Sequence, residues 1–148
     1  MNMRWAVIAA AGLLTAADGA KEDAKVKEEL QKLQGTWTFV SLEVDGNKTP
    51  EAALKGSTVV VKGDTFTTVT GDVTYKGTFK LDVAKKPKTI DLMFTEGPEK
   101  GNTSLAIYEL DGDAWRICLD IGNKGRPKEF ASKASSGHVL ETLKRAKP

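Results

Sequence analysis

The amino-acid sequence predicts an all-β protein: a single antiparallel up-and-down β-barrel of eight or nine strands, preceded by an N-terminal helix. Short segments with apolar residues at alternate positions follow one another from residue 36 onward. Glycine-containing tight turns separate these segments, and almost no helix is expected after residue 56. Because closure of consecutive hairpins into a barrel removes exposed strand edges, we prefer the barrel to its alternative, a two-sheet sandwich.

Composition and length are those of one globular domain. The chain has 148 residues, of which 40% are hydrophobic and 28% charged, so it can bury a core and is not a disordered sequence. Its formal net charge of +2 is too small to indicate a nucleic-acid-binding surface. We therefore expect no nucleic-acid partner.

The N-terminal segment has the layout of a secretory signal. Arg4 is followed by an apolar run over residues 5–14 and then by small residues, with cleavage expected after Ala17, Gly19 or Ala20. The apolar run is shorter than the roughly 20 residues that span a bilayer, although a retained N-terminal anchor is the alternative.

These features divide the chain into a signal peptide, residues 1–20, and a barrel domain, residues 21–148. The protein is then exported to a periplasmic, cell-surface or extracellular location, and the mature chain has no transmembrane segment. Cys118 is the single cysteine, so an intrachain disulfide is excluded and the domain depends on packing. We interpret Cys118 as a small strand residue, with a reactive or intermolecular thiol as the alternative.

The mature chain opens with a helix over residues 21–34. Val26, Leu30 and Leu33 recur at spacings of four and three and form one narrow apolar stripe. Gly35 can adopt the left-handed conformation that ends a helix. A second, short helix is expected over residues 49–56 because Pro50 suits a first helical turn.

Strands are expected between tight turns over most of the remaining chain. Within residues 73–82 the alternation of apolar and polar residues is clearest, and Gly77 interrupts the apolar face, which indicates a bend or a close approach. The sequence Asp111-Gly112 is typical of a two-residue hairpin turn. The predicted strands are 36–44, 57–62, 65–70, 73–82, 88–95, 103–110, 114–120, 128–131 and 138–145.

Aromatic residues are available to line a lumen, and from them we expect a small, mostly apolar ligand. In the strand 114–120, Arg116, Cys118 and Asp120 share one face, which either lines the lumen or lies outside. If that face points inward, Arg116 is the most polar group that the barrel offers to a ligand. The candidate ligand-binding residues are Tyr75, Phe79, Phe94, Tyr108 and Arg116.

Catalytic and metal-binding motifs are absent from the sequence. It has no G-x-S-x-G elbow, no phosphate-binding glycine loop and no H-E-x-x-H, so we expect no catalytic residues and no enzyme activity. Asp111 and Asp113 are explained by turn chemistry rather than by calcium. No cofactor is expected; the alternative is a haem ligated by His138, the single histidine.

A basic loop, residues 122–137, offers a different functional hypothesis. Lys124, Arg126, Lys128 and Lys133 make this long connection positive, and it is either solvated or a contact for an anion or a partner. With the N-terminal helix, it could serve an envelope protein-interaction or structural module. The sequence identifies no particular protein partner.

The motif G-T-W at residues 35–37, which follows a helix and enters the first strand, resembles the G-x-W signature of lipocalins and related calycin barrels. The resemblance implies that Trp37 plugs the closed end of the barrel and that an arginine near the last strand packs over it. Arg145, in the terminal L-K-R, is the residue in the matching position. Stacking of guanidinium on indole is favourable.

A second resemblance covers nearly the whole mature chain, from Leu33 to Arg145. The ordered motifs L-Q-G-T-W-T-F-V, P-K-T-I-D-L, I-Y-E-L-D-G-D, R-I-C-L and R-P-K-E-F are similar to those of uncharacterised secreted domains found mainly in planctomycete bacteria. This resemblance implies export and a lipocalin-like barrel, but it transfers no activity. The first functional hypothesis is therefore a secreted, non-enzymatic barrel that binds a small apolar ligand.

Overall fold

The structure, a computed structural model, describes residues 19–147, so the predicted signal peptide lies outside the described residues except for its last two positions. The described part of the N-terminal helix covers residues 19–33. The other elements are β1 (Gly35–Val44), β2 (Asn47–Lys48), α2 (Glu51–Leu54), β3 (Thr58–Lys62), β4 (Thr65–Thr70), β5 (Val73–Asp82), β6 (Lys88–Glu96), β7 (Thr103–Asp111), β8 (Ala114–Asp120) and β9 (His138–Arg145).

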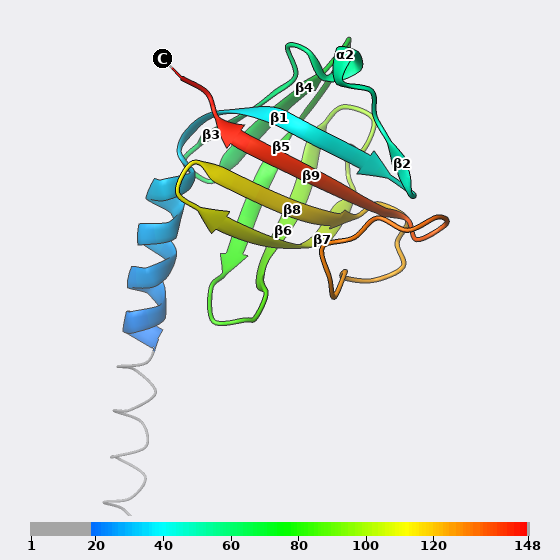
Figure 1. Ribbon diagram of the computed structural model, residues 1–148. Helices are drawn as coiled ribbons and strands as arrows, with labels where there is room; N and C mark the ends of the chain where they lie inside the picture. The colour runs from blue at the N-terminus through cyan, green and yellow to red at the C-terminus, as the bar shows by residue number, and fades with distance from the viewer. Residues whose placement is uncertain (1–18, 148) are drawn as a thin grey trace, which may run out of the picture.

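The strands form a closed antiparallel barrel of eight strands, with β2 as one extra strand at its edge (Figure 1). From β3 to β9 each strand pairs with the next along the chain, and β1 pairs with both β3 and β9. The pairing of β1 with β9 joins the first barrel strand to the last one. It confirms the predicted fold class and rules out the two-sheet sandwich.

The N-terminal helix meets β1 at one end of the barrel (Figure 1), and buried side chains close that end. Leu33 and Trp37 are both fully buried, and the indole Nε1 of Trp37 donates a hydrogen bond to the Leu33 carbonyl at 2.9 Å. Between them, Gly35 has a φ of +116°, a backbone conformation that residues with a side chain rarely adopt. The glycine thus lets the chain turn from the helix into the barrel wall.

Arg145 connects three parts of the chain at this closed end. Its guanidinium carbon lies 4.4 Å from the centroid of the Trp37 ring. Its Nη1 donates to the carbonyl of Gln34 at 2.9 Å, and its Nη2 donates to the carbonyl of Lys32. These carbonyls belong to the end of the helix, where they lack intrahelical partners, so Arg145 caps the helix while it covers the tryptophan.

Two local predictions have different outcomes. A Cβ on Gly77 would lie 2.2 Å from the Met93 carbonyl oxygen, and the register of β5 and β6 shifts beside it, which confirms a close approach. The strand expected at 128–131 is wrong, because these residues form no strand. Since β8 already pairs with β7 and β9, the barrel has no free edge there for another strand.

Candidate functional site: the barrel cavity

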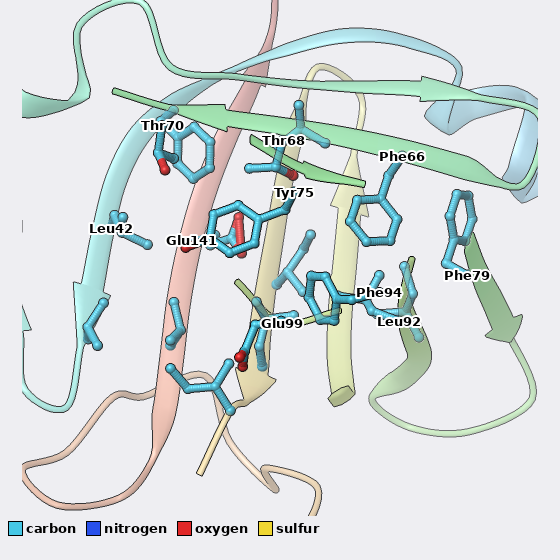
Figure 2. A pocket seen from close by; sticks show the side chains of 18 of the residues that line it. Leu42, Phe66, Thr68, Thr70, Tyr75, Phe79, Leu92, Phe94, Glu99 and Glu141 are labelled. Carbon is cyan, nitrogen blue, oxygen red and sulfur yellow. The ribbon is translucent and has the colours of Figure 1, made fainter. Parts of the chain in front are cut away.

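A cavity of about 380 Å³ lies inside the barrel (Figure 2). The side chains that line it come from β1, β3, β4, β5, β6, β8 and β9, because alternate residues of each strand point inward. Most of these side chains are aliphatic or aromatic, and the volume falls within the range of small-molecule sites, about 300–1,000 Å³. The cavity therefore offers an apolar environment of ligand size.

The cavity extends from the closed end toward the opposite end of the barrel. Trp115, at its floor, packs edge-on against Trp37 with ring centroids 5.2 Å apart. Along β1 the lining includes Phe39 and ends at Val44, which pairs with Val139 of β9. Residues 98, 99 and 121, from the connections after β6 and β8, complete the lining at that far end.

Three aromatic rings form one continuous section of the wall. Phe94 of β6 contacts Phe66 of β4 with centroids 5.5 Å apart, and it contacts Tyr75 of β5 with centroids 6.1 Å apart. Both contacts are edge-on, with interplanar angles of 89° and 65°. In this arrangement the edge of one ring meets the face of the next, which favours a fixed wall.

Glu141 of β9 is the buried charge-bearing residue of the lining. Glu141 is 9% exposed, and Figure 2 shows its side chain directed into the cavity near Leu42, its partner in the sheet. In the sheet it pairs with Leu42 of β1 and Ile117 of β8, so both strand neighbours are apolar. Burial raises the pKa of the Glu141 carboxyl to about 7.

The other charged lining residue is also an acid. Glu99, in the connection after β6, is partly buried at the far end of the cavity and accepts a weak hydrogen bond from Asn102 at 3.5 Å. The residues that line the cavity include no lysine, arginine or histidine. The electrostatic character of the cavity is therefore set by two carboxyl groups.

The sequence-based candidates separate into two groups. Tyr75, Phe79 and Phe94 line the cavity, as the alternation of their strands indicated. Tyr108 is buried but does not reach it: its hydroxyl contacts Glu29 of the N-terminal helix, with the two oxygens 3.2 Å apart. Burial and the neighbouring Glu29 raise the pKa of Tyr108 above its usual value.

Glu29 makes Tyr108 part of the joint between helix and barrel. The Nζ of Lys88 donates to the same Glu29 carboxylate oxygen at 2.9 Å, and Glu29 is 6% exposed. A hydroxyl and an ammonium thus satisfy a nearly buried carboxylate. The expected role of Tyr108 in lining the lumen is corrected to anchoring the helix.

Arg116 lies on the outer face of β8, which removes it from the cavity lining. It forms an ion pair with Glu109 at 2.6 Å and stacks over Phe130 with its guanidinium carbon 4.2 Å from the ring centroid. Cys118, on the same face, is fully buried beneath the connection after β8, and its Sγ lies 3.4 Å from the Ala131 carbonyl oxygen. Burial raises the pKa of the Cys118 thiol.

The basic loop contacts the outside of the barrel rather than only solvent. Arg126 forms an ion pair with Asp91 at 2.7 Å and donates to the Ala106 carbonyl, while Lys133 pairs with Glu129 at 3.0 Å. His138 contributes to a groove between this loop and β9, and it is not among the residues that line the cavity. Arg126 thus holds the loop to the barrel wall, whereas Lys133 pairs within the loop itself.

Sequence reasoning missed the residues that give the cavity its polar features. Glu141 occupies the same face as Val139 and Leu143, a pattern that could have identified an inward-facing acid in the last strand. Thr68 and Thr70 of β4 also line the cavity. Because β4 is rich in threonine, its two faces differ little in polarity, and the sequence does not show which face points inward. Their orientation becomes clear only from strand pairing.

Residues 19–147 contain no group of three or more histidine, cysteine, aspartate or glutamate side chains arranged to hold a metal ion. In the same residues, no helix has both the length and the apolar character needed to cross a membrane.

No protein-family model matches the chain, and no curated protein shows a significant match. Among solved structures, a DUF4847 family protein from Bacteroides vulgatus is similar to this chain, with 16% sequence identity and a TM-score of 0.46. The similarity covers 78% of this chain and 95% of that protein.

Proposed function

We propose that this protein is an exported, non-enzymatic barrel that binds a small, mostly apolar ligand in its central cavity. The observation that carries the proposal is the cavity of about 380 Å³, whose wall is predominantly aliphatic and aromatic. Such a space favours apolar molecules because their transfer out of water is worth roughly 25 cal/mol per Å² of buried apolar surface.

A binding role also agrees with the surroundings of the buried acid. Catalytic carboxyl groups generally act with a partner group that shares the transfer of protons or charge. The strand neighbours of Glu141 are Leu42 and Ile117, and the other charged residue of the described lining, Glu99, lies in the connection at the far end of the cavity. The lining is thus better suited to holding a molecule than to transforming one.

We further propose that the barrel is lipocalin-like and related to the secreted planctomycete domains that its motifs resemble. The support for this relationship is the joint formed by Gly35, Trp37 and Arg145, in which the arginine covers the tryptophan at the closed end. Export is supported by the charged, apolar and small-residue order of residues 1–20.

The two alternative functions receive less support from the contacts. An interaction module would use the basic loop and the N-terminal helix, but the helix already packs Val26, Leu30 and Leu33 against the barrel core. The haem alternative requires His138 at the cavity, whereas this residue lies in the outer groove. We therefore propose neither as the main function.

Binding can be tested with N-phenyl-1-naphthylamine, an uncharged lipophile that becomes fluorescent in apolar sites. We expect saturable fluorescence enhancement and an increase in Tm as the probe concentration rises. At a probe concentration of 100 times Kd, binding to the folded state alone adds about 2.7 kcal/mol to stability, which corresponds to a Tm increase of roughly 5–15 °C.

A pair of tryptophan substitutions locates the binding site. Thr68→Trp places a large ring in the cavity, whereas the control Thr67→Trp places it on the outer face of the same strand. We expect loss of probe binding only in Thr68→Trp, with both variants unfolding cooperatively. Absence of binding to the unsubstituted protein, or equal binding to the two variants, would contradict the proposed function.

A further inference from the structure

The cavity contains a buried acid, Glu141, that an apolar ligand alone would leave without a partner. We propose that its ligand is an amphipathic organic cation, an alkyl- or arylammonium compound, whose charged nitrogen pairs with Glu141 while its apolar part fills the rest of the cavity. This inference rests on the proposed binding function and specifies the ligand class.

The Glu141 carboxyl has no counterion among residues 19–147. Its side chain is buried, it points into the cavity, and its pKa is raised by burial with no contribution from a charged neighbour or a hydrogen bond. Burial of a carboxyl without a partner is unfavourable, and buried charges in proteins are normally paired. A cationic ligand would supply the missing partner from outside the chain.

The Glu29 carboxyl shows how this same fold treats a buried acid that serves structure. Glu29 is 6% exposed and contacts both the Lys88 ammonium and the Tyr108 hydroxyl. Glu141 is 9% exposed, yet it faces Leu42 and Ile117. Glu29 therefore has its polar partners within the chain, whereas the Glu141 carboxyl is left available to a ligand in the cavity.

The described lining as a whole carries only acidic charged groups. Glu99 adds another carboxyl at the far end of the cavity, and the lining residues include no lysine, arginine or histidine. A carboxylate or phosphate ligand would therefore be placed near like charges without a cation to offset them, which disfavours fatty acids and other anionic lipids.

Aromatic rings line the same cavity as the acid. Tyr75 and Phe94 are in edge-on contact, and Figure 2 shows Tyr75 directed toward the same space as Glu141. Aromatic faces attract cations, and the hydroxyl oxygens of Tyr75, Thr68 and Thr70 can accept hydrogen bonds from an ammonium group. The cavity thus contains several groups besides Glu141 that suit a protonated amine.

The ligand's apolar part has space on the side of the closed end. Glu141 lies two residues along β9 from Val139, which lines the far end, and two residues from Leu143, which pairs with Trp115 at the floor. Phe66, Phe79 and Leu92 line the region toward the floor (Figure 2). An ammonium with one apolar chain can therefore pair with Glu141 while its chain is buried.

The test compares three ligands of one chain length: octylamine, 1-octanol and octanoate, titrated calorimetrically at pH 8. At this pH the amine is protonated and Glu141 is largely ionised. The protein is studied unsubstituted and as two variants, Glu141→Gln and the matched control Glu43→Gln. Glu43 is on β1 between the inward residues Leu42 and Val44, so its side chain lies outside the barrel.

We expect octylamine to bind the unsubstituted protein at least 10-fold more tightly than 1-octanol, and octanoate to bind more weakly than both. Glu141→Gln should weaken octylamine binding by roughly 10- to 100-fold, the usual range for loss of a charge-assisted contact. The same substitution should leave octanol binding unchanged or stronger. Glu43→Gln should leave the affinity of all three ligands within about 2-fold.

The outcomes separate this inference from the proposed function. If octanol and octylamine bind with equal affinity, or if Glu141→Gln does not reduce amine binding, the inference is wrong while apolar ligand binding is retained. Preferential binding of octanoate also overturns it. If none of the three ligands and no neutral lipophile binds, both the inference and the proposed function fail.

Discussion

At the scale of single residues, burial of the Glu141 carboxyl lowers the stability of the fold, and it also leaves an acidic group available to a ligand in the cavity. An acid surrounded by Leu42, Ile117 and a mostly apolar cavity has a carboxyl pKa of about 7 because its ionised form loses hydration. Glu99 and Tyr75 are the other titratable side chains in the lining, and neither carries a positive charge that would favour ionisation of Glu141. The folded, unliganded protein therefore resists loss of this proton.

This residue makes stability depend on pH in a defined direction. Between pH 4.5, the ordinary carboxyl pKa, and about pH 7, the folded protein keeps a proton that the unfolded chain releases. The unfolded state then binds fewer protons, so the free energy of unfolding decreases as pH rises and levels off above pH 7. The contribution of Glu141 to this decrease is about 3 kcal/mol.

Glu141→Gln should remove that dependence. We expect the variant and the unsubstituted protein to have similar stability at pH 4, and the variant to be more stable by up to about 3 kcal/mol at pH 8. Urea unfolding at several pH values measures the difference, with Glu43→Gln as the control for a change of charge on the outer wall. Equal pH profiles for the Glu141→Gln variant and the unsubstituted protein would show that burial does not raise the pKa of Glu141.

At the scale of structural elements, the joint between the N-terminal helix and the barrel depends on Trp37. Its ring is fully buried, packs against Trp115, accepts the Arg145 guanidinium over one face and donates a hydrogen bond to Leu33. Arg145 in turn caps the end of the helix. The helix and the floor of the barrel are therefore expected to be stable or unstable together.

Trp37→Ala should lower the free energy of unfolding by roughly 3–5 kcal/mol, because it leaves a cavity and removes the surface that Arg145 covers. Denaturant unfolding monitored by circular dichroism measures this loss. Val40→Ala, on the same strand but 48% exposed, serves as the control and should change stability little. Unchanged stability of Trp37→Ala together with lost ligand binding would indicate that Trp37 serves the ligand instead of the fold.

Sequence patterns predicted some strands of the barrel well and one strand, β1, less well. Alternation in residues 73–82 and the turn glycines identified β5 and its neighbours, and Gly77 indicated the close approach that the structure contains. The period of two fails in β1, where a register shift between Phe39 and Ser41 places Phe39 and Leu42 on the same inner wall. Such a bulge leaves no simple signal in the sequence.

At the scale of the whole molecule, the pairing of β1 with β9 turns a series of hairpins into a closed wall. This junction joins segments about a hundred residues apart, with Trp37 opposite Arg145 and Val44 opposite Val139. A closed wall has no exposed edge along these strands, and it surrounds the cavity around the barrel axis. The pairing of β1 with β9 therefore both closes the barrel and completes the wall of the cavity.

Hydrogen exchange should report this closure. We expect the backbone amides of β1 and β9 that pair across the junction to be protected nearly as strongly as those between β5 and β6. Native-state exchange followed by NMR provides the comparison, and the solvent-exposed amides of the Gly71–Asp72 turn serve as an unprotected reference. Fast exchange along β1 and β9 only would indicate a sheet that is open at this junction.

The sequence by itself determined the number and order of most strands, the helix that ends before Gly35, and the residues of the closed end. These features depend on local periodicity, turn chemistry and short motifs. Only the tertiary structure decided that Tyr108 anchors the helix, that Arg116 lies outside, and that residues 128–131 form no strand. It also placed the buried acid Glu141 in the cavity. The physical reason is that the face a side chain occupies depends on strand register and on which segments cover the wall, and both arise only when distant parts of the chain pair.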